Sequence, residues 1–202
     1  MLMKQKHPSS SRRSGRRGWT LIETTLTTII VGVAITALIK LVLTNTQQNR
    51  YTLRLTTGTL LAENVREMMA GLPFNDPAYG TSTFGPEPGE VLANYDDVDD
   101  FDGFDSTVRA DITGGNPVGP VDAARRVITE TVGGVTQVPV EWRNWRQQIA
   151  VDPILDPNNL NVTAPKPDTA RTCVRVTVTI SYQYPGTATW ETVTQLRWIK
   201  TR

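Results

Sequence analysis

The feature that most constrains this chain is an uncharged run of 16 residues between Glu23 and Lys40. As an α-helix the run would be roughly 24 Å long, because each residue adds ~1.5 Å. Leu21 and Ile22 extend it on one side and residues 41–43 on the other, so the segment approaches the ~30 Å of a bilayer core. The long side chain of Lys40 can reach toward the headgroups. We therefore expect one membrane-spanning helix.

Charge is divided unevenly around this run. Residues 1–18 hold six Lys and Arg and no acid, whereas the rest of the chain holds 15 basic and 20 acidic side chains, a net charge of −5. Basic residues ahead of a membrane helix remain in the cytoplasm, which predicts a cytoplasmic N-terminus and an exported C-terminal body. An acidic body has no basic face for nucleic acid, so we expect no nucleic-acid partner.

The rare residues exclude several functions. The one histidine, His7, lies in the basic head, and the one cysteine, Cys173, lies in the body. An intramolecular disulfide, a Cys-rich zinc site, a catalytic triad and a histidine metal site are therefore excluded from the body. Without a nucleophile motif or a phosphate loop, the sequence predicts a protein that is not an enzyme. Cys173 is expected to be a small buried hydrophobe.

Two kinds of export signal compete with a membrane anchor. A secretory signal peptide needs a shorter apolar stretch that ends in a small-residue cleavage site, but here the apolar run continues into an amphipathic segment. Ser11-Arg12-Arg13 hints at a twin-arginine signal, yet Gly15 stands where an apolar residue is expected. Both signals fit the residues less well than an anchor.

The residues around Gly18, Arg-Arg-Gly-Trp-Thr-Leu-Ile-Glu, resemble the processing site of the type IV prepilin family, which includes the pseudopilins of type II secretion. The resemblance covers about residues 12–45 and extends more weakly to residue 71. It implies that prepilin peptidase cleaves after Gly18 and that Trp19 becomes the N-methylated first residue. Glu23 is then the fifth mature residue. The departures are Trp19, where phenylalanine is usual, and a high threonine content in the span.

This resemblance implies a structural function. The chain would be a subunit of a pilus-like filament or a secretion pseudopilus, held in the inner membrane before it joins other pilin or pseudopilin subunits. A carboxylate in an apolar segment is costly, and the N-terminal amine of a neighbouring subunit would relieve this cost at Glu23. Such head-to-tail contacts build open helical assemblies.

A second interpretation remains open. Thr20 and Glu23 also form a capping box, T-x-x-E, ahead of an apolar run. The protein would then be a permanently anchored single-pass protein whose exported β-domain binds a cation, a glycan or a partner.

The pattern predicts an α+β, pilin-like fold, in which a long N-terminal helix packs on a small antiparallel sheet. We expect a leader at residues 1–18, a membrane or filament-core helix at 19–45, an amphipathic continuation at 46–71 and an exported β-rich domain at 72–202. The apolar residues of the continuation recur near helical spacing, and Gly71-Leu72-Pro73 stops the helix: Leu53, Leu60, Leu61, Val65, Met68, Met69 and Leu72.

Strand signals are strongest near the end of the chain. Apolar and polar residues alternate from Val174 to Tyr184, a turn follows, and residues 189–199 return as a second strand. A hairpin is expected at Gly133-Gly134, between 126–132 and 135–140, with a further strand at 141–151 and a long loop at 152–170. The tryptophans of these segments are expected to pack in the core or at its edge: Trp142, Trp145, Trp190 and Trp198.

Residues 94–105 contain six aspartates, all within the last ten positions. Packed carboxylates repel one another, so the segment is either a solvated loop or a cation site. The EF-hand pattern fails, because it would place Val98 at the first ligand position. The sequence requires no cofactor, and the ion it allows is calcium, held by oxygens that lie close together in the chain: Asp97, Asp99, Asp100, Asp102 and Asp105.

Overall fold

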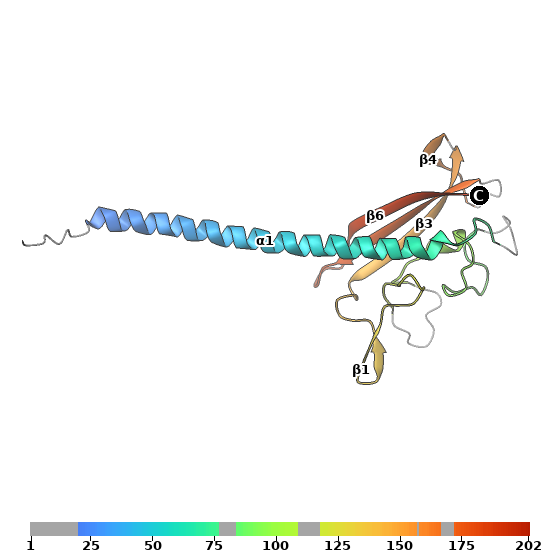
Figure 1. Ribbon diagram of the computed structural model, residues 1–202, viewed down its shortest axis with the longest axis horizontal. Coiled ribbons are helices and arrows are strands. Elements are labelled where there is room, and N and C mark those ends of the chain that lie inside the picture. Colours follow the sequence, from blue (N-terminus) through green and yellow to red (C-terminus); the bar gives the residue numbers. More distant parts are fainter. Residues whose placement is uncertain (1–19, 77–83, 109–117, 157, 167–171) are drawn as a thin grey trace, which may run out of the picture. The chain divides into compact units, whose positions relative to one another are not determined.

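The computed structural model describes residues 20–76, 84–108, 118–156, 158–166 and 172–202. The chain divides into two compact units, Met1–Asn49 and Arg50–Arg202. The described residues form one long helix, one short 3₁₀ helix and six strands (Figure 1): α1 (Leu21–Ala70), η1 (Asp99–Phe101), β1 (Glu130–Val132), β2 (Val135–Gln137), β3 (Trp145–Asp156), β4 (Asn159–Thr163), β5 (Cys173–Gln183) and β6 (Trp190–Thr201).

The fold is the expected pilin-like α+β arrangement, a long N-terminal helix packed on a four-stranded antiparallel sheet. From Arg50 onward α1 buries one face, and its buried residues recur every three or four positions: Gly58, Leu61, Ala62, Val65, Met68 and Met69. Leu53 and Leu60 are exposed, although the sequence pattern grouped them with the apolar residues of this helix. They lie seven residues apart and share a face that is turned by about 100° from the face of Leu61.

The helix ends as predicted. Its last residue is Ala70, and the Leu72 N–H donates to the carbonyl of Met69 at 3.3 Å in the turn that follows. The side chain of Lys200, from β6, donates to the carbonyl of Leu72 at 2.8 Å. The end of α1 is therefore tied to the last strand of the sheet.

The sheet has the order β4-β3-β5-β6, and every neighbouring pair is antiparallel. The two strands predicted near the end of the chain are confirmed as β5 and β6, with Val176 opposite Trp198. The expected strand at 141–151 is also present, but β3 begins later, at Trp145, and continues to Asp156.

The expected loop at 152–170 is wrong over its first half. β3 runs on to Asp156, and β4 pairs back along it, with Ile154 opposite Thr163. The prolines in this range suggested a loop, yet Pro153 lies within β3. Proline has no N–H to donate, but the Pro153 carbonyl accepts the Ala164 N–H at 2.8 Å, so the strand remains paired there. The Asp156 carboxylate accepts the Asn158 N–H at 2.8 Å and closes the turn.

The predicted hairpin is confirmed at its turn but is shorter than expected. Gly133 and Gly134 have φ of +61° and +84°, the left-handed conformation that a two-residue hairpin turn requires. β1 and β2 extend for three residues each, with Glu130 opposite Gln137. After β2 the chain turns at Pro139, whose carbonyl accepts the Trp142 N–H at 2.9 Å.

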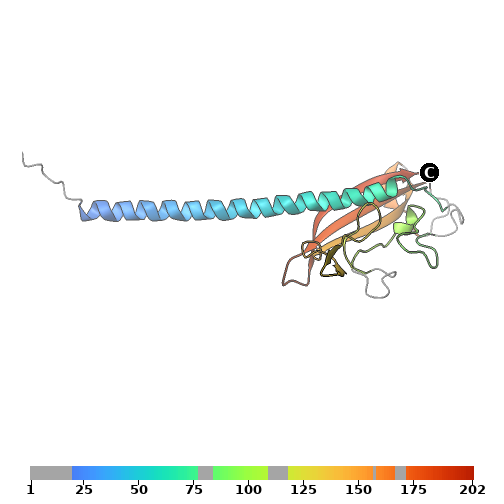
Figure 2. The ribbon, with the colours of Figure 1, turned by 60° about the horizontal axis from the view of Figure 1, so that its bottom comes forward.

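The core of the second unit lies between residues 50–70 of α1, the inner face of β3 and β5, and the segment 84–108 (Figure 2). Val65, Val176 and Phe101 are fully buried there. Gly58 lets helix and sheet approach closely, because a Cβ at this position would lie 3.0 Å from Val193 Cγ1. Trp145 and Cys173 are buried as predicted, and Trp142, Trp190 and Trp198 are partly buried.

Candidate functional site

The first candidate site is the surface of α1 before residue 50. All side chains of the described residues 20–49 are exposed. The helix is long and apolar enough to cross a membrane. A soluble protein rarely exposes such a continuous apolar surface, so this part of the helix is built to contact lipid or other proteins.

Threonine hydroxyls do not interrupt this apolar character. Six threonines between residues 24 and 44 donate to a backbone carbonyl three or four residues earlier. The distances are short, for example 2.7 Å from Thr27 Oγ1 to the carbonyl of Glu23. The bonds satisfy the hydroxyls within the helix, as expected for threonine in an apolar environment.

Glu23 lies in the first turn of α1, and its side chain is exposed. Its N–H donates to the Thr20 carbonyl at 3.0 Å, and in the described chain neither side chain of the predicted capping box makes the capping hydrogen bond. The carboxylate is therefore free to meet a partner. Gly18 and Trp19, the predicted processing residues, lie outside the described residues.

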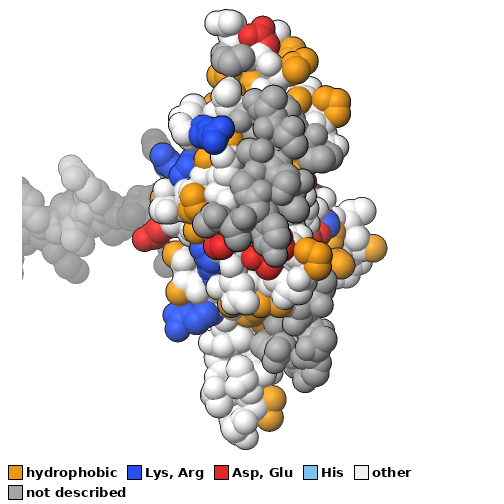
Figure 3. Space-filling view, turned by 90° about the vertical axis from the view of Figure 1, so that its right-hand side faces the viewer, with side chains coloured by type: hydrophobic (Ala, Val, Ile, Leu, Met, Phe, Trp, Pro, Cys, Tyr) orange, Lys and Arg blue, Asp and Glu red, His pale blue; other side chains and the backbone are white. Residues whose placement is uncertain are grey.

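The second candidate site is the acidic segment, and its interpretation as a solvated loop is wrong. Asp97, Asp99 and Asp100 are at most 3% exposed. Asp97 Oδ1 accepts the N–H groups of Asp99 and Asp100 at 2.8 and 3.2 Å. Asp100 Oδ2 accepts those of Asp96 and Asp97 at 2.8 and 3.1 Å. These carboxylates accept hydrogen bonds from the backbone of their own segment and hold it in a compact turn. On the face of the molecule that Figure 3 shows, the acidic side chains lie in small separate patches.

The other two predicted ligands are engaged in ion pairs. Asp102 Oδ1 accepts hydrogen bonds from the Lys166 ammonium at 2.6 Å and from the Val151 N–H at 2.9 Å. Asp105 forms a bidentate pair with the guanidinium of Arg146. Burial alone would raise the pKa of Asp105, but hydrogen bonds from Arg146 and Thr107, together with the charge of Arg146, outweigh it and hold the pKa below its usual value.

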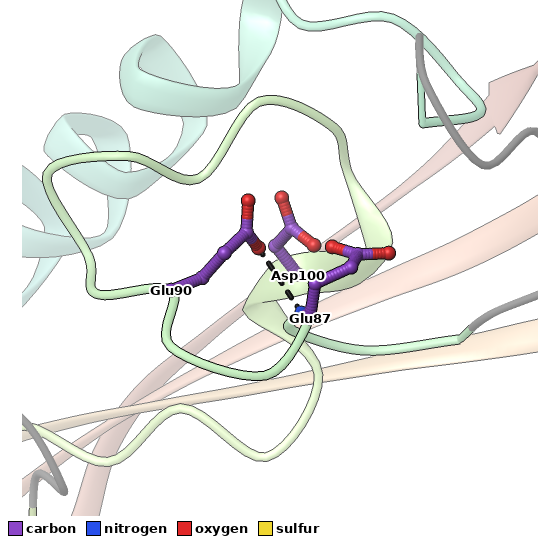
Figure 4. A group of neighbouring side chains, drawn as sticks. All are labelled: Glu87, Glu90 and Asp100. Carbon is purple, nitrogen blue, oxygen red and sulfur yellow. Dashed lines mark hydrogen bonds between the residues drawn. The ribbon is translucent and has the colours of Figure 1, made fainter.

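The carboxyl groups that converge in the described residues are those of Glu87, Glu90 and Asp100 (Figure 4). One carboxylate oxygen from each lies within 4.8 Å of the other two. Glu90 Oε2 also accepts the Glu87 N–H at 3.1 Å. Asp100 is the one member of this group that is also among the five residues predicted to bind calcium. Calcium binding by those five residues stays a prediction.

Sequence reasoning missed Glu87 and Glu90 because they lie in a segment rich in proline and glycine that indicated only a loop. The spacing of two glutamates three residues apart, ahead of the aspartates, was the available signal. Their proximity to Asp100 depends on the path of the chain between them.

Several of these acids hold their protons unusually tightly. Burial raises the pKa of Asp97 to about 8, and the charges of Asp99 and Asp100 add to the effect. Burial raises the pKa of Glu90 to about 7 and that of Asp100 to about 6, with backbone hydrogen bonds opposing the shift in both. These three carboxyl groups therefore stay protonated to a higher pH than ordinary carboxyl groups do.

No family model matches this chain, and no curated protein or solved structure is significantly similar to it.

Proposed function

We propose that this protein is a subunit of a type IV pilus-like filament or of a type II secretion pseudopilus. The observation that carries the proposal is the division of α1. Its second half buries one face on a sheet, whereas its apolar first half is exposed on every side. A helix of this kind can pass from lipid into a bundle of identical helices with little change in its surroundings.

The N-terminal sequence supports the same proposal. Prepilin peptidase would cleave after Gly18 on the cytoplasmic side of the inner membrane and remove all six leader charges. The amine of Trp19 would then be methylated and would pair with Glu23 of a neighbouring subunit. The role is structural, and the body would face the periplasm or the exterior.

The decisive experiment is the N-terminal sequence and intact mass of the protein purified from its native membranes. The proposal predicts a chain that begins at Trp19 and carries one added methyl group. A chain that retains residues 1–18 would contradict it and favour a permanently anchored protein with an exported binding domain.

A substitution at the cleavage site provides the control. Gly18→Val places a branched side chain beside the scissile bond, where an extended glycine fits a narrow protease cleft. We expect this variant to keep its leader and to remain in the membrane. Gly15→Val, three residues earlier in the same leader, should be cleaved normally.

A further inference from the structure

A short acceptor motif lies on an outer strand of the sheet. Asn161-Val162-Thr163 has the form N-x-T, in which the asparagine of an exported protein accepts a glycan. The chain holds ten asparagines, and Asn161 is the one that is followed two residues later by threonine or serine. A motif of three residues also arises by chance, so its structural setting decides whether it can be used.

The structure presents Asn161 on the surface of the second unit. All five residues of β4 are exposed, and β4 lies at the edge of the four-stranded sheet (Figure 1). The backbone N–H of Asn161 donates to Asn159 Oδ1 at 3.4 Å, whereas its side-chain amide forms no hydrogen bond with any described residue. The amide nitrogen of Asn161 is therefore accessible to a reaction partner.

The strand is loosely paired around this residue. Two register pairs flank it, Ile154 with Thr163 and Asp156 with Asn159, so three residues of β4 face one residue of β3. Such a bulge leaves its extra residues without a partner and bends the strand locally. Asn161 is the middle residue of the three. A transferase can therefore engage the motif without opening the pairing of β3 with β5.

We propose that Asn161 carries an N-linked glycan. The inference rests on the proposed function for the export of the body. The donor is a lipid-linked oligosaccharide, and the catalyst is a membrane-bound transferase. The amide nitrogen of Asn161 forms a bond to C1 of the first sugar while the bond from C1 to the lipid diphosphate breaks. The lipid diphosphate leaves, and the amide proton passes to a base of the transferase.

A glycan at this position would protect the edge of the sheet. The outer side of β4 pairs with no described strand, and an open edge of this kind invites pairing with another chain. Leu160 and Val162, on either side of Asn161, are 44% and 39% exposed. A bulky, solubilising group between them would hinder the approach of a second strand.

The test is mass spectrometry of the full-length protein purified from its native membranes. Trypsin does not cut between Lys166 and Pro167, so the motif lies within one tryptic peptide, residues 147–171, which contains no other motif of this form. We expect the peptide to carry the mass of an oligosaccharide, with fragment ions that place the sugar on Asn161. Recovery of only the unmodified peptide would overturn the inference.

Three variants test the assignment to the motif. Asn161→Gln and Thr163→Ala should lose the glycan completely, whereas Thr163→Ser preserves the motif and should keep it. A glycan that persists in Asn161→Gln would show that another residue is the acceptor.

Export is measured separately, by adding protease to intact spheroplasts. A body that is digested from outside but carries no glycan contradicts this inference alone. A body that is protected from the protease contradicts the proposed function as well.

Discussion

At the scale of single residues, the aspartates of 97–100 behave differently from what their spacing suggests. Their oxygens bond backbone N–H groups two to four residues away, a local geometry for which aspartate is well suited. What the sequence did not reveal is their burial. Their burial depends on the neighbouring side chains of Leu92, Val98 and Phe101, which join a core that is formed with residues far away in the sequence, on α1 and on the sheet.

The raised pKa of Asp97 makes stability depend on pH. The folded protein keeps a proton on Asp97 up to about pH 8, whereas the unfolded chain releases it near pH 4, so the free energy of unfolding falls as pH rises between these values. We expect the wild type to unfold more easily at pH 8 than at pH 5. Asp97→Asn should reduce this difference and leave a remainder from Glu90 and Asp100. The measurement is denaturant unfolding of the full chain in detergent, followed by tryptophan fluorescence.

Glu141→Gln is the matched control for this prediction, because Glu141 is exposed and lies outside the acidic segment. It should leave the pH dependence as in the wild type. An unchanged pH dependence in Asp97→Asn would contradict the assigned role of that residue.

At the scale of elements, regular patterns were predictable and interrupted ones were not. The alternation in β5 and the helical spacing in α1 each persist over many residues, so the sequence located both. β4 was missed because five exposed residues carry no burial pattern, and its existence depends on pairing with the end of β3. The late start of β3 follows from the turn at 139–142, where backbone hydrogen bonds replace the ladder.

The contact between α1 and the sheet gives a prediction at this scale. Gly58→Val places a branched side chain where even a Cβ would lie 3.0 Å from Val193 and 3.3 Å from Thr194. Overpacking of this kind costs about 1–3 kcal/mol, so the free energy of unfolding of the body should fall by that amount. Chemical denaturation of the full chain in detergent measures it.

Gly32→Val is the control for this change, since the same substitution in the same helix meets nothing within 4 Å. It should leave the unfolding of the body unchanged. A Gly58→Val body as stable as the wild type would show that β6 can move away from α1 without cost.

At the scale of the whole molecule, the two units have different tasks. The body buries a core of apolar side chains within itself, whereas every side chain of residues 20–49 is exposed. The sequence predicted this division from charge alone, because the uncharged run needs no tertiary context to be recognised. It did not foresee the group of Glu87, Glu90 and Asp100, which exists only in the folded chain.

Removal of the Glu23 carboxylate should separate assembly from processing. We expect Glu23→Ala to be cleaved and inserted normally but to be absent from filaments, because the neighbouring amine loses its counter-charge. Comparison of the membrane and sheared filament fractions by immunoblot measures this. Glu63→Ala is the control, since Glu63 is an exposed acid on the same helix with only a 3.6 Å surface pair to Arg66. Incorporation of Glu23→Ala at the wild-type level would contradict the pairing.

The bond from Lys200 to the end of α1 has a consequence for the timing of folding. β6 completes the sheet, and its residues are the last of the sheet to leave the ribosome. The body therefore cannot close around its helix until residue 200 has been synthesised. In the proposed function, the N-terminal half of α1 would enter the membrane long before that moment, so removal of the leader at one end of the chain would not have to wait for folding at the other.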